Sequence, residues 1–282
     1  MSRLLVLAAL ACGFAASGFG DTKFRVLTYN IHHGEGRDGK VDLDRLAGVI
    51  KSAQADIVCL QEVDRNVPRS GKLDIPAELA KKLNMPAIFE PNLKLDGGDY
   101  GNAILTRLEV IRHENIRLPT PQGAEPRGCL RATVLIAGQP VEVFNTHLSL
   151  WPTQRKEQIA AILSHVGSEP TVMVGDWNET TDAPGVRMLM SQFRDTWNAR
   201  ESADRDMRYI APRIDLILVS AQFSLLASGF VVTVDTTAAS DHFPYWAELR
   251  LERVADGAER KGIYEPKDER INEALGDKRT IP

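Results

Sequence analysis

Short apolar runs alternate with polar loops along most of the chain, and their lengths predict β-strands with helices between some of them. The predicted strands are residues 24–29, 57–61, 103–106, 132–136, 141–146, 171–175, 215–219 and 243–251. Apolar residues at helical spacing predict helices over residues 43–51, 75–83, 155–165 and 186–193. Asp42 is placed to cap the first helix, and residues 138–140 predict a tight hairpin turn. This mixture of hairpins and helical crossovers predicts an α/β (α+β) fold of two packed mixed β-sheets flanked by helices.

One domain accounts for most of the chain. A length of 282 residues is enough for one α/β domain with a sizeable core. No linker and no repeat of fixed period interrupts the pattern, so we predict a single domain over residues 21–251. Residues 252–282 are rich in charge and poor in apolar periodicity, and we assign them to a C-terminal extension without chemistry.

The N-terminal segment has the pattern of a secretory signal peptide. Arg3 precedes an apolar run over residues 4–11, and small residues continue to Gly20. The run is shorter than the roughly 20 residues that a membrane-spanning helix needs. We therefore predict that residues 1–20 are removed and that the mature chain is exported, periplasmic or secreted, with no stable membrane span.

Charge and cysteine content exclude some classes of protein. The formal net charge of −4 argues against broad non-specific attraction to a polyanion such as long DNA. A nuclease stays open, because bound divalent cations can supply positive charge locally. Cys59 and Cys129 would be the only cysteines of the mature chain, and no CxxC or HExxH pattern occurs. A disulfide scaffold, a structural zinc protein and a zinc-dependent hydrolase are therefore disfavoured.

Polar side chains recur where predicted strands give way to loops. One such residue would indicate only a turn cap or a hydrogen-bonded structural histidine. Six groups in one chain indicate a functional site, because open α/β sheets build their sites at strand ends. The groups are Asn30, Gln61-Glu62, Asn145-Thr146-His147, Gly175-Asp176-Trp177-Asn178, Arg213-Ile214-Asp215 and Ser240-Asp241-His242.

This ordered set resembles the endonuclease/exonuclease/phosphatase superfamily, whose members include deoxyribonuclease I-like nucleases, abasic-site endonucleases, neutral sphingomyelinases and inositol polyphosphate 5-phosphatases. The resemblance extends over residues 24–250, nearly all of the mature chain. It implies a four-layer sandwich, with two β-sheets face to face and helices outside. It also implies metal-dependent hydrolysis of a phosphate ester.

The predicted metal site uses oxygen ligands. Glu62 is the candidate for the primary ligand, with Asp241 as a second carboxylate near the same ion. Asn30 would hold a metal-bound water or orient Glu62. So few protein ligands suit Mg²⁺, which keeps several waters and accepts substrate oxygens, and Mn²⁺ would substitute readily.

The catalytic roles are those that the resemblance implies. Asp176 would orient or deprotonate the attacking water, and Asn178 would donate to a phosphate oxygen. His242, held by Asp215, would be a charged donor to the phosphate, or the base in a competing assignment. His147 would be a further donor to the developing charge. The sequence does not decide whether Asp176 or His242 takes the proton.

Residues near these groups are candidates for substrate binding. By resemblance, the segment from Tyr100 to Asn102 borders the site, and both residues are predicted to contact substrate. Arg127 would clamp a second anionic group, or would be a solvated surface charge. His32 and His33 invite assignment as metal ligands, but no third ligand is spaced to join them, so we expect them to line the substrate entrance.

Substrate choice belongs to the loops, which are short and carry no basic run interleaved with aromatic residues. This favours a small or lipid-derived phosphodiester, with a secreted nuclease acting on DNA or RNA as the alternative. A non-catalytic binding protein on the same fold predicts loss of the metal and donor positions, all of which are present. The sequence gives no oligomeric state.

Overall fold

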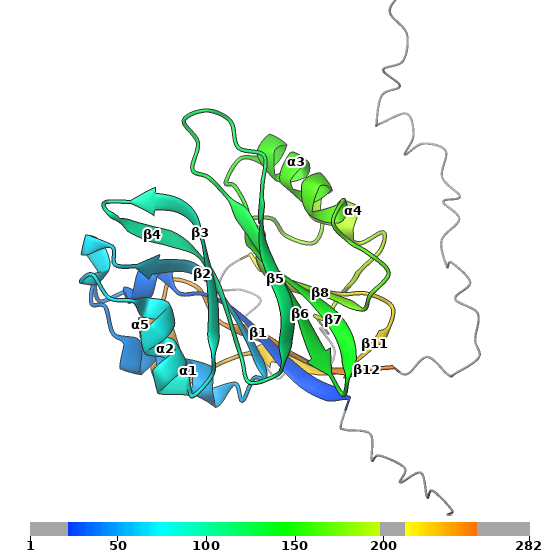
Figure 1. Cartoon of the computed structure of the whole chain (residues 1–282), viewed down its shortest axis with the longest axis horizontal. Helices are drawn as coiled ribbons and strands as arrows, with labels where there is room; N and C mark the ends of the chain where they lie inside the picture. The colour runs from blue at the N-terminus through cyan, green and yellow to red at the C-terminus, as the bar shows by residue number, and fades with distance from the viewer. Residues whose placement is uncertain (1–21, 198–211, 253–282) are drawn as a thin grey trace, which may run out of the picture. The chain divides into compact units, whose positions relative to one another are not determined.

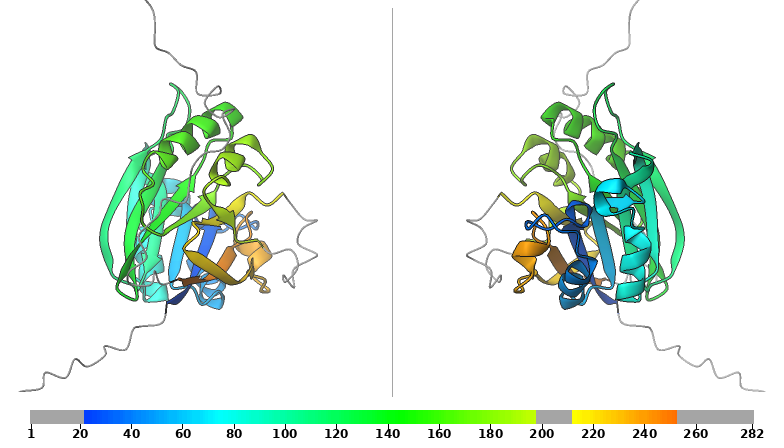
Figure 2. Two further views of the ribbon diagram at one scale, coloured as in Figure 1. Left: turned by 90° about the vertical axis from the view of Figure 1, so that its right-hand side faces the viewer. Right: turned by 90° about the vertical axis from the view of Figure 1, so that its left-hand side faces the viewer.

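Two six-stranded mixed β-sheets form the centre of the fold, seen in a computed structural model that describes residues 22–197 and 212–252 (Figure 1). The first sheet has the order β11 (Phe223–Phe230), β12 (Tyr245–Leu251), β1 (Lys23–Asn30), β2 (Ile57–Arg65), β4 (Gly98–Thr106) and β3 (Ala87–Leu95). The second has the order β5 (Val110–Arg117), β6 (Gly128–Ile136), β7 (Gln139–His147), β8 (Thr171–Asp176), β10 (Asp215–Val219) and β9 (Arg194–Asp195). Figure 2 shows β1 in blue beside β12 in orange, so strands from opposite ends of the domain are neighbours.

Three apolar clusters separate four layers. One lies between the sheets and includes Ile57 from β2 and Val143 from β7. Another packs the first sheet against α1 (Leu43–Ser52) and α2 (Ile75–Leu83), and the third packs the second sheet against α3 (Pro152–Leu163) and α4 (Pro184–Leu189). The remaining α-helix is α5 (Thr236–Ala239), and one-turn 3₁₀ helices are η1 (His32–Gly34) and η2 (Pro68–Ser70). The predicted four-layer sandwich is therefore confirmed.

The described residues cover most of the predicted domain but little of the two terminal segments that the sequence analysis set apart from it. One compact unit extends through Glu252, and the rest of the predicted C-terminal extension lies outside the described residues. The predicted signal peptide, residues 1–20, also lies outside them. None of the helices in the described part has the length and apolar character to cross a membrane.

The sequence predicted the start of α1 correctly and the position of the β6–β7 turn to within one residue. Asp42 caps α1 as predicted, because its carboxylate accepts hydrogen bonds from the backbone N–H groups of Asp44 and Arg45. The β6–β7 turn falls at Ala137 and Gly138, one residue before the predicted turn, and both adopt positive φ angles of 49° and 81°. Two consecutive positive φ angles match the twist of the flanking strands in a two-residue hairpin.

Four strands were absent from the prediction, and all of them lie at sheet edges. Strands β3, β5, β9 and β11 each have only one neighbouring strand and are mostly half-buried or exposed. An edge strand packs against fewer neighbours, so its sequence needs less regular apolar alternation. The predicted helices over residues 155–165 and 186–193 begin earlier in the structure, at Pro152 and Pro184, because proline is well suited to the first helical turn.

A buried amide joins the two sheets next to a β-bulge. The pairing of β2 with β4 shifts register between Leu60 and Val63. Asn145 of β7 reaches across the sheet interface and donates through Nδ2 to the carbonyl oxygens of Leu60, at 3.0 Å, and Ala103, at 2.9 Å. Its Oδ1 accepts a 2.7 Å hydrogen bond from Nε2 of Gln61. One side chain of the second sheet thus satisfies three polar groups of the first.

Replacing Asn145 with alanine should destabilise the protein strongly. Asn145→Ala leaves two buried carbonyls and the Gln61 amide without these partners, so the free energy of unfolding should fall by about 2–5 kcal/mol. Urea denaturation followed by circular dichroism measures this change. Thr153→Ala, at an exposed position of α3, is the control and should change stability by about 0.5 kcal/mol or less. Equal stability of the two variants would refute the role given to Asn145.

Candidate active site

Three neighbouring strands of the second sheet bring His147, Asp176 and Asp215 into line. His147 pairs with Asp176 across the parallel β7–β8 ladder, and Asp176 pairs with Asp215 across the antiparallel β8–β10 ladder. Residues paired in register project their side chains to the same face of a sheet. The three side chains predicted from separate strand ends are thus brought together, and all three are buried.

The first sheet contributes Asn30 and Glu62. Glu62 lies in the β-bulge of β2 with a φ of 56°, and bulges commonly redirect a side chain out of the strand alternation. Asn30, at the end of β1, donates through Nδ2 to Oε1 of Glu62 at 2.9 Å and to Oδ2 of Asp176 at 3.1 Å. Asn30 therefore connects the candidate metal ligand of one sheet with the candidate base of the other.

Gly175 allows Asp176 to sit this close to β7. Its φ is +145°, and a Cβ atom at this position would lie 1.9 Å from the carbonyl oxygen of Thr146. No side chain fits at that distance, so the residue before Asp176 must be glycine for the two strands to pair at the site.

His242 lies between two carboxylates. Its Nδ1 is 2.8 Å from Oδ2 of Asp215, and its Nε2 is 3.6 Å from Oδ2 of Asp176. Burial lowers the pKa of His242, but the charge and hydrogen bond of Asp215 outweigh it and raise that pKa to about 10. Burial and the neighbouring Asp215 charge raise the pKa of Asp176 to about 7. These surroundings favour the charged form of His242 and, at Asp176, favour the protonated carboxyl more than water does.

His147 has the opposite electrostatic character. Burial lowers its pKa well below the usual value, and the positive charges of Arg127 and His242 lower it further. Its Nε2 lies 3.5 Å from Oδ2 of Asp176, and its Nδ1 lies 3.9 Å from Oε1 of Glu62 without a hydrogen-bond partner. His147 is therefore a neutral imidazole, suited to donate a hydrogen bond but not to supply a charge.

The predicted amide donors differ in what they contact. Asn178 has a φ of 50°, and its backbone N–H donates to Oδ1 of Asp176 at 3.0 Å while its side chain donates to the carbonyl of Leu148 at 2.9 Å. Asn102 is buried, and its Nδ2 donates to the carbonyls of Gly128 at 3.0 Å and Asn145 at 3.5 Å. Both amide hydrogens of Asn102 thus face backbone carbonyls of the protein, and its contact with substrate stays a prediction.

Tyr100 and Arg127 lie at the border of the site. Both are buried, and burial followed by the charge of Glu62 raises the pKa of Tyr100. Arg127 pairs with Glu125 at 3.1 Å, while its Nε has no hydrogen-bond partner. Because its charge also lowers the pKa of His147, Arg127 is close enough to act on an anion in the site and is not a solvated surface charge. Substrate contact by Tyr100 and Arg127 stays a prediction.

Asp241 does not join Glu62 as the sequence analysis expected. Its side chain is exposed and accepts a 3.3 Å hydrogen bond from Ser240. Within residues 22–197 and 212–252, the two groups of at least three metal-ligating side chains are His32–His33–Glu62 and Asp176–Asp215–His242, and Asp241 belongs to neither. The structure therefore does not bring Glu62 and Asp241 into one such group, and a ligand role for Asp241 stays a prediction.

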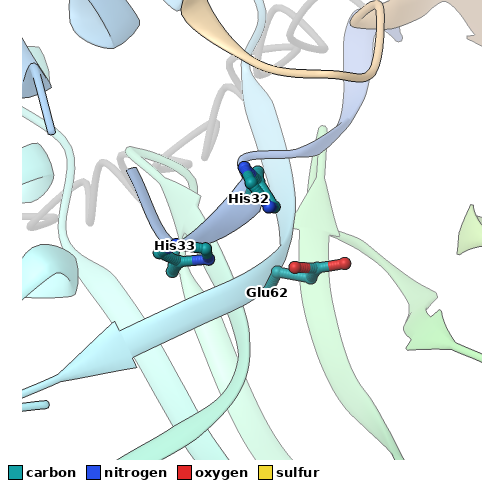
Figure 3. A group of neighbouring side chains, drawn as sticks. All are labelled: His32, His33 and Glu62. Carbon is teal, nitrogen blue, oxygen red and sulfur yellow. The ribbon is translucent and has the colours of Figure 1, made fainter. Parts of the chain in front are cut away.

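Glu62 is a third potential metal-ligating side chain beside His32 and His33, which the sequence analysis did not find. One ring nitrogen of each histidine and a carboxylate oxygen of Glu62 lie within 4.8 Å of one another. Figure 3 shows the two rings on the loop after β1 and the carboxylate on β2. Sequence spacing gave no sign of this group, because the bulge that turns Glu62 toward the loop exists only in the folded sheet.

Comparison with known proteins identifies the family. A sequence model of the Endonuclease/Exonuclease/phosphatase family matches residues 27–242. The chain belongs to the endonuclease/exonuclease/phosphatase family. Members of this family are metal-dependent phosphoesterases and nucleases, and the chain is an enzyme of this class.

Individual proteins of known sequence or structure are also similar to this chain. The uncharacterised protein YbhP of Escherichia coli K12 is 28% identical over 249 residues, which cover 81% of this chain and 96% of YbhP. A crystal structure of a family member from Beutenbergia cavernae is 28% identical, with a TM-score of 0.69 over 82% of this chain and 72% of that one. A mannosyl-6-phosphatase of Bacteroides thetaiotaomicron shares the fold, with 19% identity and a TM-score of 0.61 over 80% of this chain and 99% of that one.

The charge state of His242 should depend on Asp215. In metal-free protein His242 should keep its proton across neutral pH and lose it only as the pH approaches about 10. Asp215→Asn removes the largest charge that raises this pKa, so the pKa of His242 should fall by about 1–3, while Asp176 still raises it. Nitrogen-15 spectra of the histidine rings, recorded in EDTA, measure the titration. Asp182→Asn, at an exposed site, is the control. Identical titration of His242 in both variants would contradict the assignment.

Proposed function

We propose that this enzyme is an exported, Mg²⁺-dependent hydrolase that cleaves a phosphodiester of a small or lipid-derived substrate. The observation that carries the proposal is the continuous set of contacts from Glu62 through Asn30 and Asp176 to His242 and Asp215. It combines an oxygen ligand for a hard cation, a buried carboxyl and a cationic donor, which phosphoester hydrolysis needs.

The donor set near Glu62 fits a hard divalent ion. The Glu62 carboxylate is partly exposed, and Asn30 presents an amide beside it. Mg²⁺ is commonly held by one or two carboxylates together with waters and substrate phosphate, so Glu62 would hold it, oriented by the Asn30 amide. Such an ion polarises the phosphoryl oxygen and neutralises charge on the phosphate. Mn²⁺ favours the same oxygen ligands and would substitute.

Proton transfer is assigned to Asp176. Its pKa of about 7 places it near the pH at which a general base works best, whereas a His242 pKa of about 10 leaves that ring protonated and without a free lone pair. Asp176 therefore accepts the proton of the attacking water. His242, oriented by Asp215 at 2.8 Å, keeps its positive charge and donates to the phosphate. We therefore propose Asp176, rather than His242, as the base.

Two further donors, the neutral His147 and the charged Arg127, complete the proposed site. His147 lies 3.5 Å from Asp176 and donates a hydrogen bond to the phosphate as charge develops, without repelling His242. Arg127, with its unpartnered Nε, supplies a second positive group for a substrate anion. Preorganised donors of this kind each contribute about 10²–10³ in rate.

Three observations support the proposed substrate class and the proposed export. The Bacteroides relative is described as a mannosyl-6-phosphatase, so a small sugar phosphate is accommodated on this fold. Net negative charge and short loops also support a small substrate rather than a long nucleic acid. The apolar run behind Arg3 supports export.

Removing the charge of Glu62 and removing that of Asp176 should have different effects on Mg²⁺ affinity and on kcat. Glu62→Gln should weaken Mg²⁺ binding and lower activity together, because the main carboxylate ligand is lost. Asp176→Asn should lower kcat by about 10²–10⁴ with little change in Mg²⁺ affinity, because it removes the general base. Hydrolysis of bis-p-nitrophenyl phosphate at varied Mg²⁺, with EDTA as the blank, gives both quantities.

The control is Glu157→Gln on the exposed side of α3, which should retain full activity. Full activity of Glu62→Gln would refute its ligand role. A collapse of Mg²⁺ affinity in Asp176→Asn would show that the division of roles is wrong. Rapid cleavage of oligonucleotides with no cleavage of small diesters would favour the nuclease alternative.

A further inference from the structure

We propose that His32, His33 and Glu62 form a binding site for a borderline divalent transition ion of the Zn²⁺ or Co²⁺ class. The site goes beyond the proposed phosphoesterase activity and does not depend on it, although it shares Glu62 with the proposed magnesium site. One ring nitrogen of each histidine and one Glu62 oxygen lie within 4.8 Å of one another, and Figure 3 shows the three side chains converging from the β1 loop and from β2.

Glu35 orients both rings and leaves one nitrogen of each with a lone pair. The Nδ1 of His32 lies 3.1 Å from the carbonyl oxygen of Glu35, which only accepts, so Nδ1 carries the hydrogen and Nε2 is the unprotonated nitrogen. The Nε2 of His33 lies 3.5 Å from the carboxylate of the same Glu35. Metal-binding histidines commonly donate their second nitrogen to a carbonyl or carboxylate in this way.

The other nitrogen of His33 is a buried polar atom without a partner. Its Nδ1 is enclosed and makes no hydrogen bond to any residue that the structure describes, and the whole residue is 8% exposed. Burying a polar nitrogen without a hydrogen-bond partner costs free energy, so a ligand that supplies a partner would stabilise this arrangement. A metal ion held jointly with His32 and Glu62 supplies that partner.

The backbone at all three ligands is held in an uncommon conformation. His32, His33 and Glu62 have φ angles of 44°, 45° and 56°, in the left-handed region that residues with a Cβ atom rarely adopt. Such conformations persist where the surrounding structure imposes them, and they concentrate at functional sites. These backbone conformations orient the two histidine rings and the Glu62 carboxylate so that their ligating atoms lie close together.

The chemistry of the donors selects the class of ion. Mg²⁺ prefers an all-oxygen shell, whereas imidazole nitrogen suits Zn²⁺ and its first-row neighbours. Two histidines and one glutamate with open positions are a known donor set for zinc. The second donor group, Asp176–Asp215–His242, differs, because Nδ1 of His242 is already engaged in the 2.8 Å hydrogen bond to Asp215.

Direct metal titration tests the site without substrate. The purified, untagged chain is stripped with EDTA, desalted and titrated with Zn²⁺ by calorimetry and with Co²⁺ by visible absorption. We expect one ion per chain, with His32→Asn and His33→Asn each weakening affinity by about 10-fold or more. Asparagine is used because it tolerates the left-handed backbone, so both variants should fold, which circular dichroism checks.

The matched control is His113→Asn, at a half-exposed histidine of β5, and it should bind both ions as the parent chain does. Loss of binding in the His32 and His33 variants alone would support the site. Absence of Zn²⁺ and Co²⁺ binding by the parent chain, or unchanged affinity in both variants, would overturn it. Because no substrate is present, failure of the proposed hydrolysis would leave this result unaffected.

Discussion

The hydrogen bonds of Asn145 across the sheet interface are the constraint on which the site depends. The two sheets pack mainly through apolar side chains, and apolar packing alone does not fix how far one sheet slides along the other. The Asn145 amide fixes that position, because it must meet the carbonyls of Leu60 and Ala103 and the amide of Gln61 at once. These contacts lie beside the bulge that contains Glu62 and two residues before His147.

The relative position of the two sheets matters because each sheet contributes side chains to the candidate active site. Glu62 and Asn30 come from the first sheet, and Asp176 and Asp215 come from the second. Asn30 reaches Glu62 at 2.9 Å and Asp176 at 3.1 Å, so a displacement of about 1 Å between the sheets would break one of these hydrogen bonds. Buried polar contacts between the sheets thus serve the geometry of the site as well as stability.

Burial in this interface also sets the charges of the catalytic groups. Away from water, Asp215 holds a proton on His242 while Asp176 is driven toward neutrality, and His147 stays uncharged. Two histidines a short distance apart therefore take opposite protonation states. In the proposed mechanism, the charged His242 and the neutral His147 act on one phosphate without repelling each other.

The sequence predicted the features that are local or that repeat along the chain. Strand-end polarity located Asn30, Asp176 and Asp215 because parallel and antiparallel neighbours bring such residues to one edge. It missed the edge strands β3, β5, β9 and β11, whose partial burial leaves a weak apolar pattern.

Features created by register escaped the sequence analysis. The approach of Glu62 to His32 depends on a bulge, and the hydrogen bonds of Asn102 depend on which carbonyls the second sheet presents to it. Neither is visible in residue spacing. Membership of the family could be inferred from the sequence, because its motifs are short runs of residues at the ends of strands and can be read without knowing how the strands pair.

The central claim is that water activated by Asp176 attacks phosphorus. Hydrolysis of bis-p-nitrophenyl phosphate in water enriched in oxygen-18, with Mg²⁺ present, tests it most directly. Mass spectrometry of the two products locates the new oxygen. The account predicts that the label appears in p-nitrophenyl phosphate and that none appears in p-nitrophenol. Label in p-nitrophenol would mean that water attacks carbon, and it would contradict the mechanism.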